Sequence, residues 1–122
     1  MRPPFLLIAA IAGFTAVAMG AFGAHALKSV LSEHNIEVYK TAVNYHMWHA
    51  LALGLIALMP STRLLRIAGW LFLSGIVLFS GSLYLLAILN ISWLGMVTPF
   101  GGIAFLMAWG LIAYAASQKN QG

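Results

Sequence analysis

The chain has 122 residues, of which 62% are hydrophobic and 7% charged, so it cannot cover itself with a water-soluble surface. Its net charge is +4, but its lysines and arginines form no run, which argues against a nucleic acid as partner. It has no cysteine, which excludes disulfides, thiolate metal sites and thiol catalysis.

Four apolar runs follow one another along the chain, each about 18 to 23 residues long. A helix rises ~1.5 Å per residue, so each run can cross a hydrocarbon layer of ~30 Å. The sequence therefore predicts an all-α membrane protein, with residues 1–122 forming one up-down bundle of four transmembrane helices. The predicted spans are Phe5–Leu27, residues 38–59, residues 67–89 and residues 99–116; the second includes the apolar run 41–59.

The first run has a rival interpretation as a secretory signal peptide. Arg2 precedes it, and the AHA sequence at residues 24–26 resembles a cleavage site. However, the apolar stretch 5–22 is longer than the ~7–15-residue core that signal peptides usually have. We therefore expect a retained first helix.

Charged residues between the runs indicate how the helices are oriented. With four crossings, one side of the membrane receives four cationic residues: Arg2, Arg63, Arg66 and Lys119. The other side receives two cationic and two acidic residues: Lys28, Lys40, Glu33 and Glu37. Because connections rich in lysine and arginine tend to stay in the cytoplasm, both termini are expected there.

Capping and helix-breaking residues mark the helix ends. Ser32 or Asn35 is expected to cap the second helix, which ends near Met59. Asn90 is expected to close the third helix. Thr98 is expected to cap the fourth, because a proline follows it in the first turn.

Small residues form possible packing faces on the first, third and fourth helices. Such faces let helix backbones approach closely, which matters because apolar side chains gain little by leaving lipid. Two uses stay open, namely packing inside the bundle and contact with a second copy or another membrane protein. The faces contain Ala12, Ala16, Gly20 and Ala24, then Gly69, Gly75 and Gly81, then Gly101, Ala104 and Ala108.

Aromatic residues near the span ends are typical of an interfacial belt, in which an amphipathic ring lies at the level of the lipid headgroups. The residues expected there are Tyr39, Trp70, Trp93, Trp109 and Tyr114.

Three histidines are almost the only ionisable residues inside the runs: His25, His46 and His49. His46 and His49 are three residues apart, so they share one helix face. A short hairpin would bring His25 to a similar level, with Tyr45 within reach of the same layer. His49 would lie ~12 Å inside the boundary, where a charged imidazolium is costly, so we expect it to be neutral and hydrogen-bonded.

Three interpretations of this polar layer stay open. In the first, the imidazoles bond to backbone, serines and water and hold the hairpin together, with no cofactor. In the second, facing histidines bind haem or a metal, although no carboxylate lies at that depth to complete a metal site. In the third, histidine and Tyr45 form a quinone, lipid or proton site. His34 is expected to be a solvated loop residue.

The absence of several motifs argues against further classes of membrane protein. No aspartate or glutamate lies inside a run, so proton-driven export on a membrane carboxylate is disfavoured. No voltage-sensing arginine ladder, selectivity filter or phosphate-binding glycine loop is present. No catalytic residue is predicted, and an enzyme is not expected. The leading hypothesis is a non-enzymatic accessory or scaffold protein in contact with the lipid bilayer, with ligand binding and small-solute transport as alternatives.

Four motifs occur in order along the chain: GAFGAHAL at residues 20–27, YKTAVNYHMWH at 39–49, FSGSLY at 79–84 and TPFGG at 98–102. On these motifs the chain resembles the YgdD/YwdK-type family of small bacterial inner-membrane proteins, and the resemblance covers essentially the whole chain. It implies four spans and location in the bacterial cytoplasmic membrane. It implies no activity and no catalytic residue, because none is established for the family.

Overall fold

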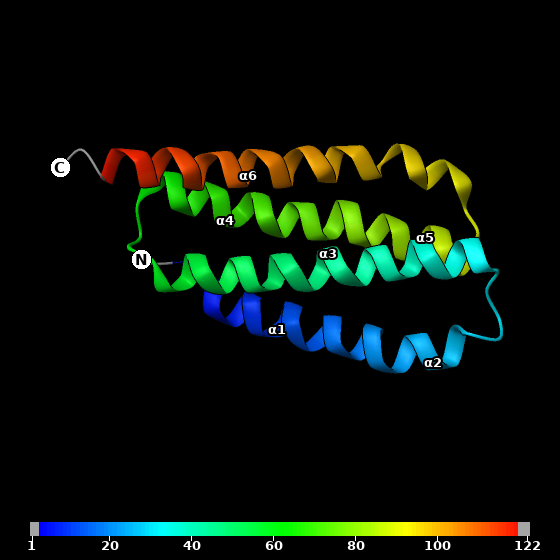
Figure 1. Cartoon of the computed structure of the whole chain (residues 1–122). Coiled ribbons are helices and arrows are strands. Elements are labelled where there is room, and N and C mark those ends of the chain that lie inside the picture. The colour runs from blue at the N-terminus through cyan, green and yellow to red at the C-terminus, as the bar shows by residue number, and fades with distance from the viewer. Residues whose placement is uncertain (1–2, 120–122) are drawn as a thin grey trace.

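The structure is a computed structural model that describes residues 3–119, without the side chains of Ala24 and Lys119. Within these residues the chain is helical, with short connections and no strand. Figure 1 shows antiparallel helical rods, with the start of the first rod and the end of the last at the same end of the molecule. Arg2, one of the cations that predict the orientation, lies outside the described residues.

The helical elements form four rods in chain order. The first rod contains α1 (Phe5–Ala18), a π-helical turn (Met19–Gly23) and α2 (Ala24–Leu27). The second is α3 (Glu33–Leu58). The third contains α4 (Arg63–Gly75), a second π-helical turn (Ile76–Ser80) and α5 (Gly81–Leu89). A 3₁₀ turn (Ser92–Met96) then leads into the fourth rod, α6 (Thr98–Lys119).

Three helical segments are long and apolar enough to cross a membrane: Phe5–Leu27, Arg63–Leu89 and Ser92–Gln118. The rod α3 is long enough but less apolar, because Asn44, His46 and His49 lie within it. The structure therefore supports a helical membrane protein.

The rods pack in a fixed order across the molecule. α1 lies along α3, α3 packs on α4 and α5, and α4 packs on α6. Figure 1 shows α1 and α6 on the two flanks, with α3 and the α4–α5 rod between them. The first apolar run is thus an integral part of the packing, with Phe5, Ala9 and Ala16 buried. The two central rods carry the polar groups described below.

The helix ends follow the predicted caps in two of three cases. The Ser32 hydroxyl accepts a hydrogen bond from the Asn35 backbone N–H at 3.1 Å, and Asn90 closes α5 with a left-handed backbone (φ 56°). The expectation for Thr98 is wrong. Its hydroxyl lies 2.6 Å from the Ser82 hydroxyl and 3.4 Å from the Leu94 carbonyl, so it joins α6 to neighbouring segments instead of capping it.

Both π-helical turns lie where another helix makes close contact. In the first, the Met19 carbonyl accepts a hydrogen bond from the Tyr39 hydroxyl on α3. The second lies against Gly101 of α6, where an added Cβ would be 2.8 Å from the Phe79 Cα. Only glycine permits this approach, so α6 packs directly on the widened turn.

The small-residue faces are used inside the molecule. Ala12 and Ala16 are buried where α1 meets α3, and an added Cβ at Gly20 would be 3.1 Å from Val43. On α6, Ala104 and Ala108 are buried. The side chain of Ala24 lies outside the described residues. On the third rod, a Cβ added at Gly69 or Gly75 would meet a ring of another helix, but one added at Gly81 would have no atom within 4 Å. Internal packing is therefore the use that most of these residues serve, with Gly81 as an exception.

Candidate functional site

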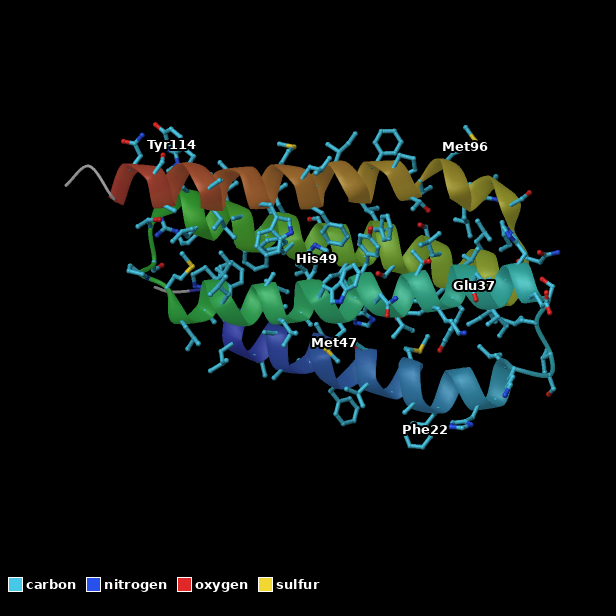
Figure 2. All side chains as sticks on the ribbon, in the orientation of Figure 1. Phe22, Glu37, Met47, His49, Met96 and Tyr114 are labelled. Carbon is cyan, nitrogen blue, oxygen red and sulfur yellow. The ribbon has the colours of Figure 1, made fainter. Side chains whose placement is uncertain are left out.

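His49 lies near the middle of the bundle, as Figure 2 shows, and is 5% exposed. Its Nε2 accepts a hydrogen bond from the Trp109 indole N–H at 3.1 Å. Because an indole only donates, the imidazole proton belongs on Nδ1, which donates to the Tyr45 carbonyl at 2.7 Å. His49 is therefore neutral, in one tautomer, with both nitrogens occupied.

Aromatic rings enclose the His49 imidazole. The Phe105 ring from α6 stacks on it with ring centroids 3.6 Å apart and an interplanar angle of 8°. Phe72 of α4 and Tyr45 of α3 lie at 5.6 and 5.9 Å. The ring of Trp109 completes the cluster at 6.1 Å. His49 thus links α3 to α6 by a hydrogen bond and a stacked ring pair.

His46 is 6% exposed and bonds to different helices. The Thr15 hydroxyl oxygen lies 3.0 Å from the Ile11 and Ala12 carbonyls, so its hydrogen points to one of them. Thr15 then accepts from His46 Nε2–H at 3.1 Å. His46 Nδ1 accepts from the Tyr84 hydroxyl at 2.8 Å. This assignment gives every polar atom in the chain of bonds a partner.

The two buried histidines therefore join different neighbours. His46 ties α3 to α1 and α5, whereas His49 ties α3 to α6. Ser80 adds a third tie, because its hydroxyl donates to the Ala42 carbonyl of α3 at 2.8 Å. Across the residues that the structure describes, no buried side-chain nitrogen or oxygen lacks a hydrogen-bond partner. The buried polar side chains of the bundle are thus satisfied internally.

The other two predicted site residues lie differently. His25 is exposed, at the end of the first rod, and makes no side-chain hydrogen bond with the described residues. Tyr45 is half-buried, and its ring lies 4.5 Å from the Phe79 ring. The structure brings Tyr45 to His49 but keeps His25 apart from the buried pair. Across residues 3–119, no three histidine, cysteine or acidic residues are grouped to hold a metal ion.

Three partners of the buried histidines were not predicted: Thr15, Tyr84 and Trp109. The belt prediction for Trp109 is wrong, since its N–H bonds inside the bundle. It is also wrong for Tyr39, which is 1% exposed and bonds to the Met19 carbonyl. The one sequence signal for Trp109 is its position four residues after Phe105, on the same face of α6.

An open groove of about 550 Å³ runs along α3 and α6 beside His49. Its walls are mostly aromatic, and they include Tyr45, Trp48, Phe79, Phe105 and Trp109. The His49 nitrogens face protein partners, so the groove offers apolar surface and no free imidazole nitrogen.

Comparison with known proteins identifies the family. A family model described as "Protein of unknown function (DUF423)" matches residues 19–102, which include all three histidines of the predicted layer. The chain belongs to the DUF423 family. Together with the relatives described next, this match confirms the resemblance to the YwdK-type family.

Individual DUF423 relatives match over most of the chain. The UPF0382 membrane protein YwdK of Bacillus subtilis is 46% identical over 116 residues, 92% of this chain and 94% of the relative. SAB0533 of Staphylococcus aureus is 41% identical over 113 residues, 91% of this chain and 93% of the relative. SH2409 of Staphylococcus haemolyticus is 43% identical over 107 residues, 86% and 88% of the two chains. These names state a membrane protein and no activity. No solved structure matches the chain.

Proposed function

We propose that this DUF423 protein crosses the bacterial cytoplasmic membrane four times, with both termini in the cytoplasm. Arg63 and Arg66 lie at the end of the bundle where α4 begins, which in Figure 1 is also where α1 begins and α6 ends. The only acidic side chains, Glu33 and Glu37, lie at the opposite end, on the first turns of α3. Lys28 and Lys40 lie at that opposite end too. Because lysine and arginine set the orientation and acidic residues contribute little, the support comes from the sequence count of four cationic residues against two.

We further propose a non-enzymatic role in which His46 and His49 are structural. The observation that carries this proposal is that all four imidazole nitrogens already have protein partners. A general base, a haem ligand or a quinone hydrogen bond each requires a nitrogen that is free to act. The histidines instead serve as ties between helices, as buried polar groups in lipid do when their partners come from neighbouring helices.

Small-solute transport is not supported by the interior of the proposed cytoplasmic half. The buried side chains there are apolar, including Leu53, Ile56, Leu65 and Phe72. Buried polar side chains in the described part of the chain are limited to His46, His49, Ser80 and Ser82. A solute would meet no polar path past the histidines. We therefore propose an accessory role in the membrane, with most of the small-residue positions used for packing inside the bundle.

The protonation states of the histidines test the structural role directly. We expect ¹⁵N spectra of the protein in lipid nanodiscs at neutral pH to show His49 protonated on Nδ1 and His46 on Nε2. His25→Gln and His34→Gln variants would assign the remaining signals, because neither residue takes part in the ties. A charged imidazolium at either buried position, or a signal shifted by a bound metal or haem, would contradict the proposal.

A further inference from the structure

A second cavity, of about 200 Å³, lies at the end of the bundle where α3 ends and α4 begins. Apolar side chains form much of its wall: Phe5 of α1, Ile56 of α3 and Leu65 of α4. Ser61 and Arg66 supply its polar edge. Arg66 directly precedes the apolar run that starts at residue 67, so the cavity lies at the expected boundary between headgroups and hydrocarbon.

Arg66 is held over this cavity with most of its donors unused. Its Nη1 donates to the Ser61 carbonyl at 3.0 Å and lies 3.5 Å from the Ser61 hydroxyl. A guanidinium has five N–H donors in a planar fork. Nε and Nη2 make no hydrogen bond to the residues that the structure describes. The Arg66 side chain is half-buried, and its guanidinium can still donate two parallel hydrogen bonds to the oxygens of a phosphate or carboxylate.

The protein itself supplies no carboxylate side chain for this cation. Glu33 and Glu37 are the only acidic residues in the chain, and both belong to the far end of α3. Glu37 already lies 3.8 Å from Lys40 there. An always-charged arginine at a lipid boundary, without an acidic side chain nearby, can bind an anion from outside the chain, and its planar guanidinium matches phosphate in geometry.

We propose that this cavity binds the phosphate of an anionic phospholipid, with Arg66 on two phosphate oxygens and the start of an acyl chain against its apolar wall, where Leu6 and Leu7 of α1 are exposed. Charge complementarity selects the headgroup, and anionic lipids of the cytoplasmic leaflet supply that charge. The apolar wall selects a lipid over free phosphate, which would gain nothing from it. The inference rests on the proposed orientation, which puts this end of the bundle at the cytoplasmic leaflet, and on the α4–α5 rod crossing the bilayer, but not on a crossing by α3.

The test is lipid retention by the full-length protein, measured by native mass spectrometry after loading in detergent with phosphatidylglycerol or phosphatidylcholine. Wild type is expected to retain one phosphatidylglycerol in preference to phosphatidylcholine. Arg66→Gln should lower retention about tenfold, as expected for the loss of a charge-assisted bidentate pair. Arg63→Gln is the matched control, because Arg63 is exposed and does not line the cavity, and it should retain lipid like wild type.

A second variant distinguishes the contribution of the cavity to lipid retention from that of the Arg66 charge. Ala57 lines the cavity, so Ala57→Leu should fill part of it and lower retention while both arginines remain. Circular dichroism checks that each variant is folded, and Arg66→Lys replaces Arg66→Gln if the latter is not. Equal losses in the Arg63 and Arg66 variants would overturn the proposal, as would unchanged retention in Ala57→Leu. Displacement of the lipid by excess inorganic phosphate would assign the site to free phosphate and overturn it too.

Discussion

A substitution of Trp109 tests one hydrogen bond of the histidine site, the bond from the indole N–H to His49 Nε2. The indole N–H is the donor that fixes the His49 tautomer, and the indole ring also packs on Phe72 with centroids 5.0 Å apart. Trp109→Phe therefore keeps an aromatic ring in the cluster but leaves His49 Nε2 without a partner. We expect a loss of about 1–2 kcal/mol in the free energy of unfolding, within the range for hydrogen bonds between membrane helices.

Unfolding in mixed detergent micelles measures this loss. Trp93→Phe is the control, since Trp93 is 63% exposed and makes no side-chain hydrogen bond with the described residues. An equal stability of Trp109→Phe and wild type would show that the indole bond contributes nothing to holding α6 against α3.

At the level of helices, the second π-helical turn determines how closely α6 can pack. Gly101 meets the Phe79 backbone, whereas a Cβ added at Gly110 on the same helix would have no neighbouring atom within 4 Å. Gly101→Ala is expected to lower the free energy of unfolding by about 1–3 kcal/mol, the range for overpacking a close contact. Gly110→Ala should be neutral or slightly stabilising, because alanine favours helix by up to about 1 kcal/mol.

The same unfolding assay compares the two glycine variants. If Gly101→Ala were as stable as Gly110→Ala, the close approach of α6 to the Phe79 turn would be wrong.

The sequence could predict the helical elements but not their pairing. Apolar run lengths located the rods, and local capping chemistry located Ser32 and Asn90, because both depend on residues near each other in the chain. The His46 and His49 partners could not be predicted in this way. Thr15 and Trp109 lie 31 and 60 residues away in sequence, and a run of apolar residues does not encode which helices become neighbours.

The π-helical turns were also beyond sequence reasoning. Each adds one residue to a turn inside an otherwise regular apolar run, and its partner is a long-range contact: Tyr39 for the first turn and Gly101 for the second. The prediction that Trp109 belongs to the interfacial belt failed for a related reason. An amphipathic ring satisfies its N–H equally well at an interface or on a buried acceptor, and only the three-dimensional packing distinguishes the two.

For the whole molecule, α3 is the rod on which the four-span proposal depends. It contains both buried histidines and Ser80's acceptor, Ala42, yet it is the least apolar of the four rods. Its two buried histidines need not prevent a crossing, because their nitrogens bond to groups on α1, α3, α5 and α6 and not to water. A crossing by α3 places residues 29 and 60 on opposite sides of the membrane.

The most direct measurement is labelling of single-cysteine variants in whole cells with a membrane-impermeant maleimide, which the cysteine-free chain allows without background. All four positions are exposed. Ser29→Cys and Ser92→Cys are expected to react in intact cells, and Pro60→Cys and Ser117→Cys only after permeabilisation. Reaction of Ser29→Cys and Pro60→Cys on the same side would show that α3 does not cross the membrane and would contradict the four-span proposal.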